Sequence, residues 1–135
     1  MRSIQPEVFE VRDDGTRVLI GGYCVSSDQY HFPLQECCPY TGATDVERVE
    51  LSTRGALWGW TAVTAAPPGY DGPLPYGFGV VELERERLRV ITRLTVADPA
   101  ALSFGLSMLL SSEQVAVDTD GTGLHAWSFA PVVDP

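Results

Sequence analysis

The chain has 135 residues and is acidic, with 18 Asp and Glu residues against 9 basic ones and a formal net charge of −9. This length fits one domain, and a hydrophobic fraction of 44% is enough for a core. The charge argues against nucleic acid or an anionic membrane as a partner. The sequence has no apolar run of the roughly 18 residues that span a bilayer and no secretion signal. We therefore expect a cytoplasmic protein that binds proteins or small molecules.

Residues 1–20 are polar and mixed in composition, and we expect an N-terminal extension there. The sequence Asp13–Thr16 predicts a turn between two short strands. Residues 21–46 are rich in Gly, Cys, Pro and Asp and lack helical periodicity, which predicts loops and short hairpins.

The segment 21–46 has the spacing of a degenerate zinc ribbon. A ribbon holds one tetrahedral ion between two Cys-x2-Cys knuckles. Here the four knuckle positions are Cys24, Ser27, Cys38 and Thr41. Because a neutral hydroxyl is a poor zinc ligand, we expect the frame of the ribbon without its zinc.

Three states of these thiols remain open. His31 and Cys37 lie close in sequence and could complete a metal site with Cys24 and Cys38. A Cys24–Cys38 disulfide could replace the metal, although a reducing cytoplasm disfavours it. The third state is a pair of reduced thiols in a loop held by packing and hydrogen bonds.

Residues 47–135 read as an all-β domain, and we expect a five-stranded OB-fold barrel. Asp98 and Pro99 have the pattern of an N-cap and a first helical residue, which predicts a short helix over Ala100–Phe104 that ends at Gly105. One helix between the third and fourth principal strands is the OB order. The β-rich stretches are Val46–Thr64 with a bulge or bend at Gly55, Tyr76–Leu83, Leu88–Val96, Leu106–Leu110, Val115–Val117 and Leu124–Pro131.

The stretch Leu88–Val96 alternates between apolar and polar residues. The even-numbered residues should face the barrel interior. The odd-numbered positions then place Arg87, Arg89 and Arg93 on one outer face. That face is either a solvated surface that prevents aggregation or a patch for an anionic group or acidic partner.

Aromatic residues gather on two of the expected strands. Trp58 and Trp60 have the same parity, so we expect them on one face, and Tyr76 and Phe78 repeat the pattern. Such residues fill a barrel core, stack on a base or an adenine, or anchor a protein interface.

The sequence offers no catalytic constellation. Its two histidines are His31 and His125, and it lacks the nucleophile-elbow, phosphate-loop and zinc-protease motifs. We assign no catalytic residue and expect the chain not to be an enzyme by itself.

The order of several motifs, taken together over residues 20–131, resembles the acyl-CoA-associated OB-fold proteins called domain of unknown function 35 (DUF35). The motifs are the knuckle spacing, Phe32-Pro33, Cys38-Pro39-x-x-Gly42, Gly55-x-x-Trp58-x-Trp60-Thr61, Pro75-Tyr76, Val80-Val81-Glu82-Leu83, Gly105-x-x-Met108 and Trp127-Ser-Phe129-Ala-Pro131. The resemblance implies a rubredoxin-like ribbon followed by an OB barrel. The replacement of two cysteines, at Ser27 and Thr41, departs from the family pattern.

Members of that family act as small subunits of thiolase-superfamily enzymes, including thiolases, acyl-CoA synthases and retro-aldolases. The resemblance implies a hetero-oligomer in which a thiolase-like subunit carries the chemistry and this chain docks on it and lines its acyl-CoA channel. The alternative is a stand-alone OB module for a small ligand or nucleic acid. The residues we assign to partner or ligand binding are Trp58, Trp60, Pro75, Tyr76, Arg89 and Arg93, with the proline-rich loop Ala65–Pro75 as an edge of the site.

Overall fold

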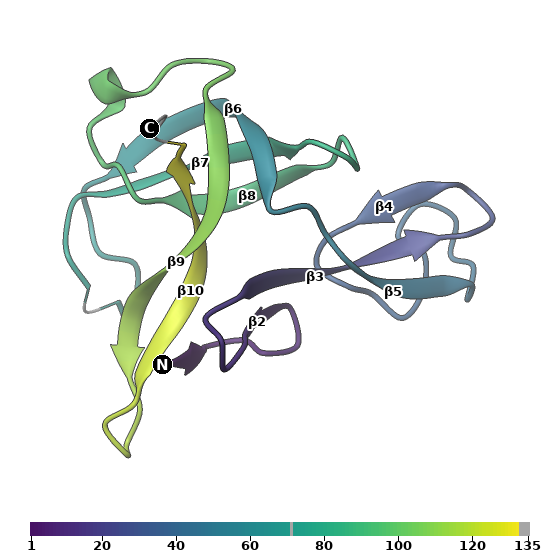
Figure 1. Ribbon diagram of the computed structural model, residues 1–135, viewed down its shortest axis with the longest axis horizontal. Helices are drawn as coiled ribbons and strands as arrows, with labels where there is room; N and C mark the ends of the chain where they lie inside the picture. Colours follow the sequence, from purple (N-terminus) through teal and green to yellow (C-terminus); the bar gives the residue numbers. More distant parts are fainter. Residues whose placement is uncertain (71, 133–135) are drawn as a thin grey trace.

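The computed structural model describes residues 1–70 and 72–132, and nearly all of its regular structure is β (Figure 1). The elements are β1 (Arg2–Ser3), β2 (Phe9–Val11), β3 (Arg17–Cys24), β4 (Gln29–His31), β5 (Val46–Glu50), β6 (Arg54–Val63), β7 (Tyr76–Leu83), β8 (Arg89–Leu94), the 3₁₀ helix η1 (Pro99–Ala101), β9 (Ser107–Val117) and β10 (Gly123–Pro131).

Strands β6 to β10 form a closed barrel with the strand order β10-β8-β7-β6-β9, and β9 pairs with β10 to complete the ring. The β8–β10 pairing is parallel and the other four are antiparallel. Helix η1 lies between the third and fourth barrel strands. This arrangement confirms the predicted OB fold.

The barrel core follows the predicted alternation of β8. Val90, Thr92 and Leu94 are each at most 2% exposed and face inward. Leu57, Val81, Leu83, Met108 and Phe129 from the other four strands complete the interior with exposures of 1% or less. Burial of one complete face of β8, as of β7, explains why the period-2 pattern of the sequence was informative here.

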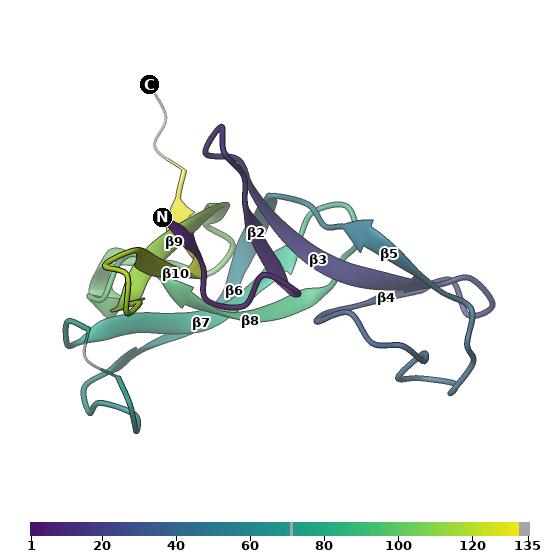
Figure 2. The ribbon, with the colours of Figure 1, turned by 90° about the horizontal axis from the view of Figure 1, so that it is seen from below.

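A second, smaller sheet is built around β3. The first half of β3 pairs with β2, while its second half pairs with β4 and β5. Figure 2 shows β3 leading away from the barrel to these two strands. Strand β3 runs across residues 20 and 21, where we predicted the extension to end and the ribbon-like segment to begin, and that division stays a prediction.

The expected strand Val46–Thr64 is wrong as one element, because the chain leaves the small sheet after β5 and enters the barrel at β6. At this crossing Leu51 is buried and its N–H donates to the carbonyl of Leu19. The β-bulge also differs from the prediction. It lies between Leu57 and Gly59, whereas Gly55 allows close approach of β7, since an added Cβ would lie 2.5 Å from the Glu82 carbonyl oxygen.

Two further segments differ in extent from their predictions. The predicted helix is a single 3₁₀ turn, with Asp98 as its N-cap accepting from the Ala100 N–H at 3.0 Å, and Gly105 adopts a φ of +84° four residues after its end. The predicted stretch Leu106–Leu110, apart from its first residue, and the stretch Val115–Val117 belong to one long strand, β9. Its pairing with β10 keeps the chain extended between them.

Candidate partner-binding site

Apolar side chains gather on the outer face of β6, β7 and β8. Trp58, Phe78 and Ile91 are 45%, 37% and 63% exposed, and with Val80 they line one shallow groove. Val80 and Ile91 are direct cross-strand partners, so their outward direction follows from the alternation that buries their neighbours. We call these four residues the outer patch.

A second groove of about 470 Å³ adjoins the outer patch and shares Phe78 and Ile91 with it. Its other wall is formed by Phe32 and Pro33 of the ribbon-like segment and by Trp127 of β10. The Phe32 and Trp127 rings meet edge to face, with centroids 5.3 Å apart. This aromatic pair fixes the ribbon-like segment against the barrel and gives the apolar surface its depth.

The bulge in β6 separates the two tryptophans that we expected on one face. Trp58 is the extra residue and is exposed, while Trp60 packs against the buried core and donates its Nε1–H to the Pro99 carbonyl at 3.0 Å. The prediction of a shared face is therefore wrong, because one inserted residue reverses the parity of the strand.

Arg89 lies over the exposed ring of Trp58. Its guanidinium carbon is 4.2 Å from the ring centroid, and its Nε is 3.6 Å from a carboxylate oxygen of Glu82. At an exposed site a cation–π contact contributes about 0.5–1 kcal/mol. The side chain stays half-exposed, so an anionic group can still reach it.

Arg93 occupies a more enclosed position on the same side of the sheet. Its guanidinium carbon is 4.2 Å from the centroid of the Tyr76 ring, and its Nη2 donates to the Tyr70 hydroxyl at 3.2 Å. Glu113 lies 3.6 Å from its Nε. Arg87 stands apart from this cluster, in the β7–β8 turn with a φ of +55°.

The proline-rich loop folds back onto the barrel through Tyr70. The Tyr70 hydroxyl donates to the Pro73 carbonyl at 2.8 Å, and its ring packs on Tyr76 with centroids 5.1 Å apart. Pro75 is exposed and follows a cis peptide bond. Asp71, inside this loop, lies outside the described residues.

Of the six residues assigned from the sequence, the structure therefore brings together Trp58 with Arg89, and Tyr76 with Arg93 and Pro75. We had not assigned Phe78 and Ile91, although their parity with Tyr76 and Arg89 would have identified them. Trp127 and Phe32 gave no such signal, because they meet only through packing between distant parts of the chain.

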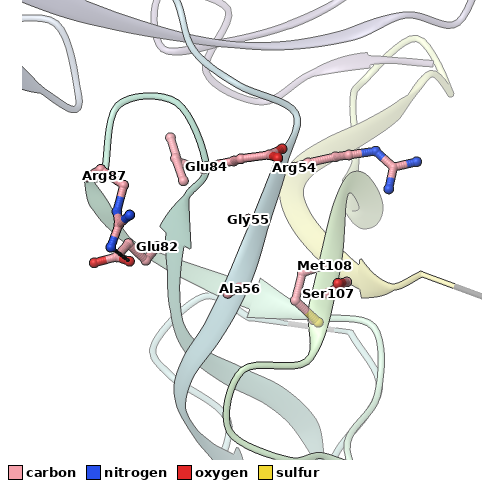
Figure 3. Close-up of a pocket in the computed structure, with 9 residues that line it drawn as sticks. Arg54, Gly55, Ala56, Glu82, Glu84, Arg87, Ser107 and Met108 are labelled. Atoms are coloured by element: carbon pink, nitrogen blue, oxygen red, sulfur yellow. Dashed lines mark ion pairs between the residues drawn. The ribbon is translucent and has the colours of Figure 1, made fainter.

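A polar groove of about 390 Å³ is lined by residues of β6, β7, β9 and the turn after β7 (Figure 3). In the close-up, Arg87 and Glu82 form an ion pair at 3.3 Å, while Ser107 and Met108 line the groove from β9. Arg54 extends away from the ion pair. The groove is lined mainly by charged side chains of β6, β7 and the turn after β7, and we assign it no function.

A serine and a histidine also meet in the barrel hairpin. The Oγ of Ser112 is 2.9 Å from Nδ1 of His125 and accepts a hydrogen bond from Nε of Arg17 at 2.7 Å. Burial and the nearby Arg17 charge lower the pKa of His125. Because Arg17 of β3 donates to the serine oxygen, the contact links β3 to the barrel hairpin, and we assign the pair no catalytic role.

The ribbon-like segment places His31 beside the first knuckle. The ring is 4% exposed, and its Nδ1 is 3.6 Å from Sγ of Cys24. Nε2 accepts the N–H of Gln35 at 3.1 Å, so the proton of the neutral ring belongs on Nδ1, which donates to the sulfur. Burial lowers the pKa of His31.

The second knuckle surrounds Cys38 with hydrogen-bond donors. Burial raises its pKa, but hydrogen bonds from the Cys24 thiol, the Thr41 hydroxyl and the N–H groups of Tyr40 and Thr41 outweigh this and lower the pKa to about 6. Burial and the bond to Cys38 raise the pKa of Cys24 to about 11. Ser27 adds its Oγ at 3.8 Å from the Cys38 sulfur.

These residues do not fit a zinc ion. Among the described residues no group of three or more His, Cys, Asp or Glu side chains is placed to hold a metal. Both His31 nitrogens already have partners within the protein, and Cys37 is exposed. Two thiols remain where a structural site needs four ligands.

Comparison with known proteins agrees with this architecture. Residues 48–110 match the family model described as ChsH2, C-terminal OB-fold domain. The chain is similar in fold to a solved structure titled Ltp2-ChsH2(DUF35) aldolase, with a TM-score of 0.66, 24% identity and coverage of 86% of each chain.

Curated relatives extend the similarity along most of the sequence. DUF35 domain-containing scaffold proteins of Pyrococcus furiosus and Methanocaldococcus jannaschii are 29% and 27% identical, over 85% and 84% of this chain and 84% and 82% of theirs. Benzoylsuccinyl-CoA thiolase subunit BbsA of Thauera aromatica is 29% identical over 94% of this chain and 86% of its own.

Fold and comparisons together define an OB-fold protein that is similar to DUF35 scaffold proteins and to a protein named as a thiolase subunit. The family model, the curated relatives and the solved structure together support a place for this chain among the DUF35 OB-fold proteins. Within the described residues, none of the helical structure is long and apolar enough to cross a membrane.

Proposed function

We propose that this chain is a non-catalytic subunit of an acyl-CoA enzyme and docks on a thiolase-like catalytic subunit. The observation that carries the proposal is the exposed outer patch, on a chain similar over 94% of its length to a named thiolase subunit. The nucleophile, acid and base of the reaction belong to the partner in this proposal.

The outer patch has the chemistry of a docking surface. Exposed large apolar side chains are ordinary when scattered, but Trp58, Phe78 and Ile91 line one groove. Their removal from water on docking contributes about 25 cal/mol per Å² of apolar area buried. Arg89 at the rim adds a half-exposed cation, which selects for a partner surface with a carboxylate.

The same face supports a role in lining an acyl-CoA channel. Trp58 offers a flat ring on which an adenine can stack, and Arg89 beside it can meet a phosphate. Tyr76, Arg93 and Pro75 extend this surface toward the proline-rich loop. In this proposal Trp60 acts mainly through packing, because it lies against the core, bonds to η1 and borders the groove of the outer patch.

The proposal is tested by affinity purification of the tagged chain from its native cells, with mass spectrometry of proteins that remain after a salt wash. We expect a stoichiometric thiolase-fold protein. An Ile91→Asp variant should lose it, while Val117→Asp, a matched control at a similarly exposed position on β9, should retain it. Recovery of the chain alone and monodisperse would contradict the docking role.

Binding that survives in Ile91→Asp as in the control would place the docking surface elsewhere on the molecule. The channel-lining role has a separate readout. With the complex in hand, Arg89→Gln should raise the KM for the acyl-CoA substrate more than it lowers kcat. An unchanged KM would remove Arg89 from the acyl-CoA site.

A further inference from the structure

A pair of buried thiols takes no part in the proposed docking. Cys24 ends β3 and is 0% exposed, and Cys38 lies 2% exposed in the loop between β4 and β5. The loop is closed by bonds from the Cys38 N–H to the Ala43 carbonyl and from the Gly42 N–H to the Cys38 carbonyl, both at 2.8 Å. The Cys24 sulfur lies 3.6 Å from Nδ1 of His31 and the Cys38 sulfur 3.8 Å from Oγ of Ser27, and the two thiols are close enough for each to shift the pKa of the other.

The surroundings of this pair favour sulfur chemistry over metal binding. His31 and Ser27, the neighbours that could complete a ligand set, instead direct hydrogen-bonding groups at the two sulfurs. Hydrogen bonds to sulfur stabilise the thiolate, which is the form that reacts with oxidants and disulfides. The third cysteine, Cys37, is exposed and separate from the pair.

We propose that Cys24 and Cys38 form a redox-active dithiol that hydrogen peroxide converts into an intramolecular disulfide. The small size of peroxide suits a buried pair that a larger oxidant cannot reach. The disulfide would join the end of β3 to the loop before β5 and so fasten the two knuckle loops where a zinc ribbon has its metal.

The reaction is balanced by one peroxide. The Cys38 thiolate attacks one peroxide oxygen, the O–O bond breaks, and hydroxide leaves to become water after taking up a proton. The sulfur of Cys24 attacks the resulting sulfenic acid of Cys38 and gives up its proton as the S–S bond forms, and the hydroxide that leaves takes up that proton to become the second water. Two thiols are oxidised, one peroxide is reduced, and the two thiol protons end in two molecules of water.

The test uses the full chain, purified under reducing conditions and desalted. Treatment with a few equivalents of hydrogen peroxide should lower the intact mass by about 2 Da, and dithiothreitol should restore it. Non-reducing peptide mapping should find Cys24 linked to Cys38. The same loss should occur in Cys37→Ser, which removes the exposed thiol and leaves the pair in place.

Cys24→Ser in the Cys37→Ser background is the matched control, and it should gain about 16 or 32 Da at Cys38 instead of losing mass. Because the measurement on the native chain needs no variant, poor folding of the control does not weaken the test. Oxygen adducts on Cys38 in the native chain, two thiols left unreacted, or zinc retained through native purification would each overturn the proposal. The experiment involves no partner, so its outcome is independent of the docking role.

Discussion

Arg89 lies over the ring of Trp58, and this contact exists because β6 carries one residue more than β7 beside it. Leu57 and Trp60 are three residues apart, so in a regular strand they would face opposite sides. The bulge lets both side chains pack toward the core. Bulges commonly redirect a side chain beside a functional surface. Here the bulge turns a tryptophan outward at the edge of the outer patch, next to a half-exposed cation.

The two tryptophans should respond differently to truncation. Trp58→Ala should cost about 1 kcal/mol of stability or less, since the exposed ring loses mainly its contact with Arg89. Trp60→Ala should cost about 2–3 kcal/mol, because its ring packs on the core and its Nε1–H bond to Pro99 disappears. Urea unfolding of both variants measures the difference. Equal losses would contradict the separation of the two residues by the bulge.

Glu86 should be a main support of the crossing between the two sheets. Its side chain is 1% exposed, and its carboxylate accepts hydrogen bonds from the N–H and hydroxyl of Ser52. Glu86→Ala should lower the free energy of unfolding by about 2 kcal/mol, since the Ser52 N–H loses its partner. Urea unfolding checks this, with Glu84→Ala in the same turn as an exposed control. A loss no larger than that of the control would contradict this role for Glu86.

Stability should fall in mild acid through His31. Burial holds its pKa below the ordinary 6.5, so the unfolded chain binds the proton more readily than the folded one. The contribution of the neutral ring is therefore complete above pH 6.5 and is lost as the pH falls toward the lower pKa of the folded state. Protonation also removes Nε2 as an acceptor for the Gln35 N–H.

The measurement is the shift in urea midpoint between about pH 7.5 and about pH 5.5, a window that spans histidine titration. We expect the shift to shrink in His31→Gln and, separately, in His125→Gln, whose pKa is also lowered by burial. An unchanged shift in His31→Gln would show that His31 does not contribute to the acid response.

Sequence alone predicted those features that depend on local period and spacing. The alternation of β8, with Val90 inside and Arg89 outside, needs only one buried face. We predicted the bulge at Gly55, but it lies at Trp58. A glycine within a strand can mark either a bulge or the close approach of a neighbouring strand, and the sequence does not distinguish the two. The outer groove was missed because Phe32 reaches Trp127 only after two sheets have packed together.

In the ribbon-like segment, too, spacing predicted one feature and missed another. Spacing predicted that Cys24 and Cys38 would lie near each other, and in the structure each thiol shifts the pKa of the other. It did not predict that His31 would divide its two nitrogens between a sulfur and a backbone N–H, since that depends on the register of β3 and β4. The difference matters because it decides between a metal ligand and a hydrogen-bond donor.

Gly22 should be required for the position of His31. The two residues are cross-strand partners, and a Cβ added to Gly22 would lie 2.2 Å from a carbon of the imidazole ring. Gly22→Ala should therefore displace the ring and lower the free energy of unfolding by roughly 1–3 kcal/mol, the usual cost of overpacking. Gly59→Ala, at a glycine with open space around its Cβ, is the control for the loss of glycine itself.

A double-mutant cycle with His31→Ala identifies the cause of that loss. If the ring is what the new methyl group meets, Gly22→Ala should cost much less in the His31→Ala background than in the native chain. Urea unfolding of the four proteins gives the coupling. If the two losses in unfolding free energy are additive, glycine is required at position 22 for the backbone conformation of β3 and not to make room for the ring.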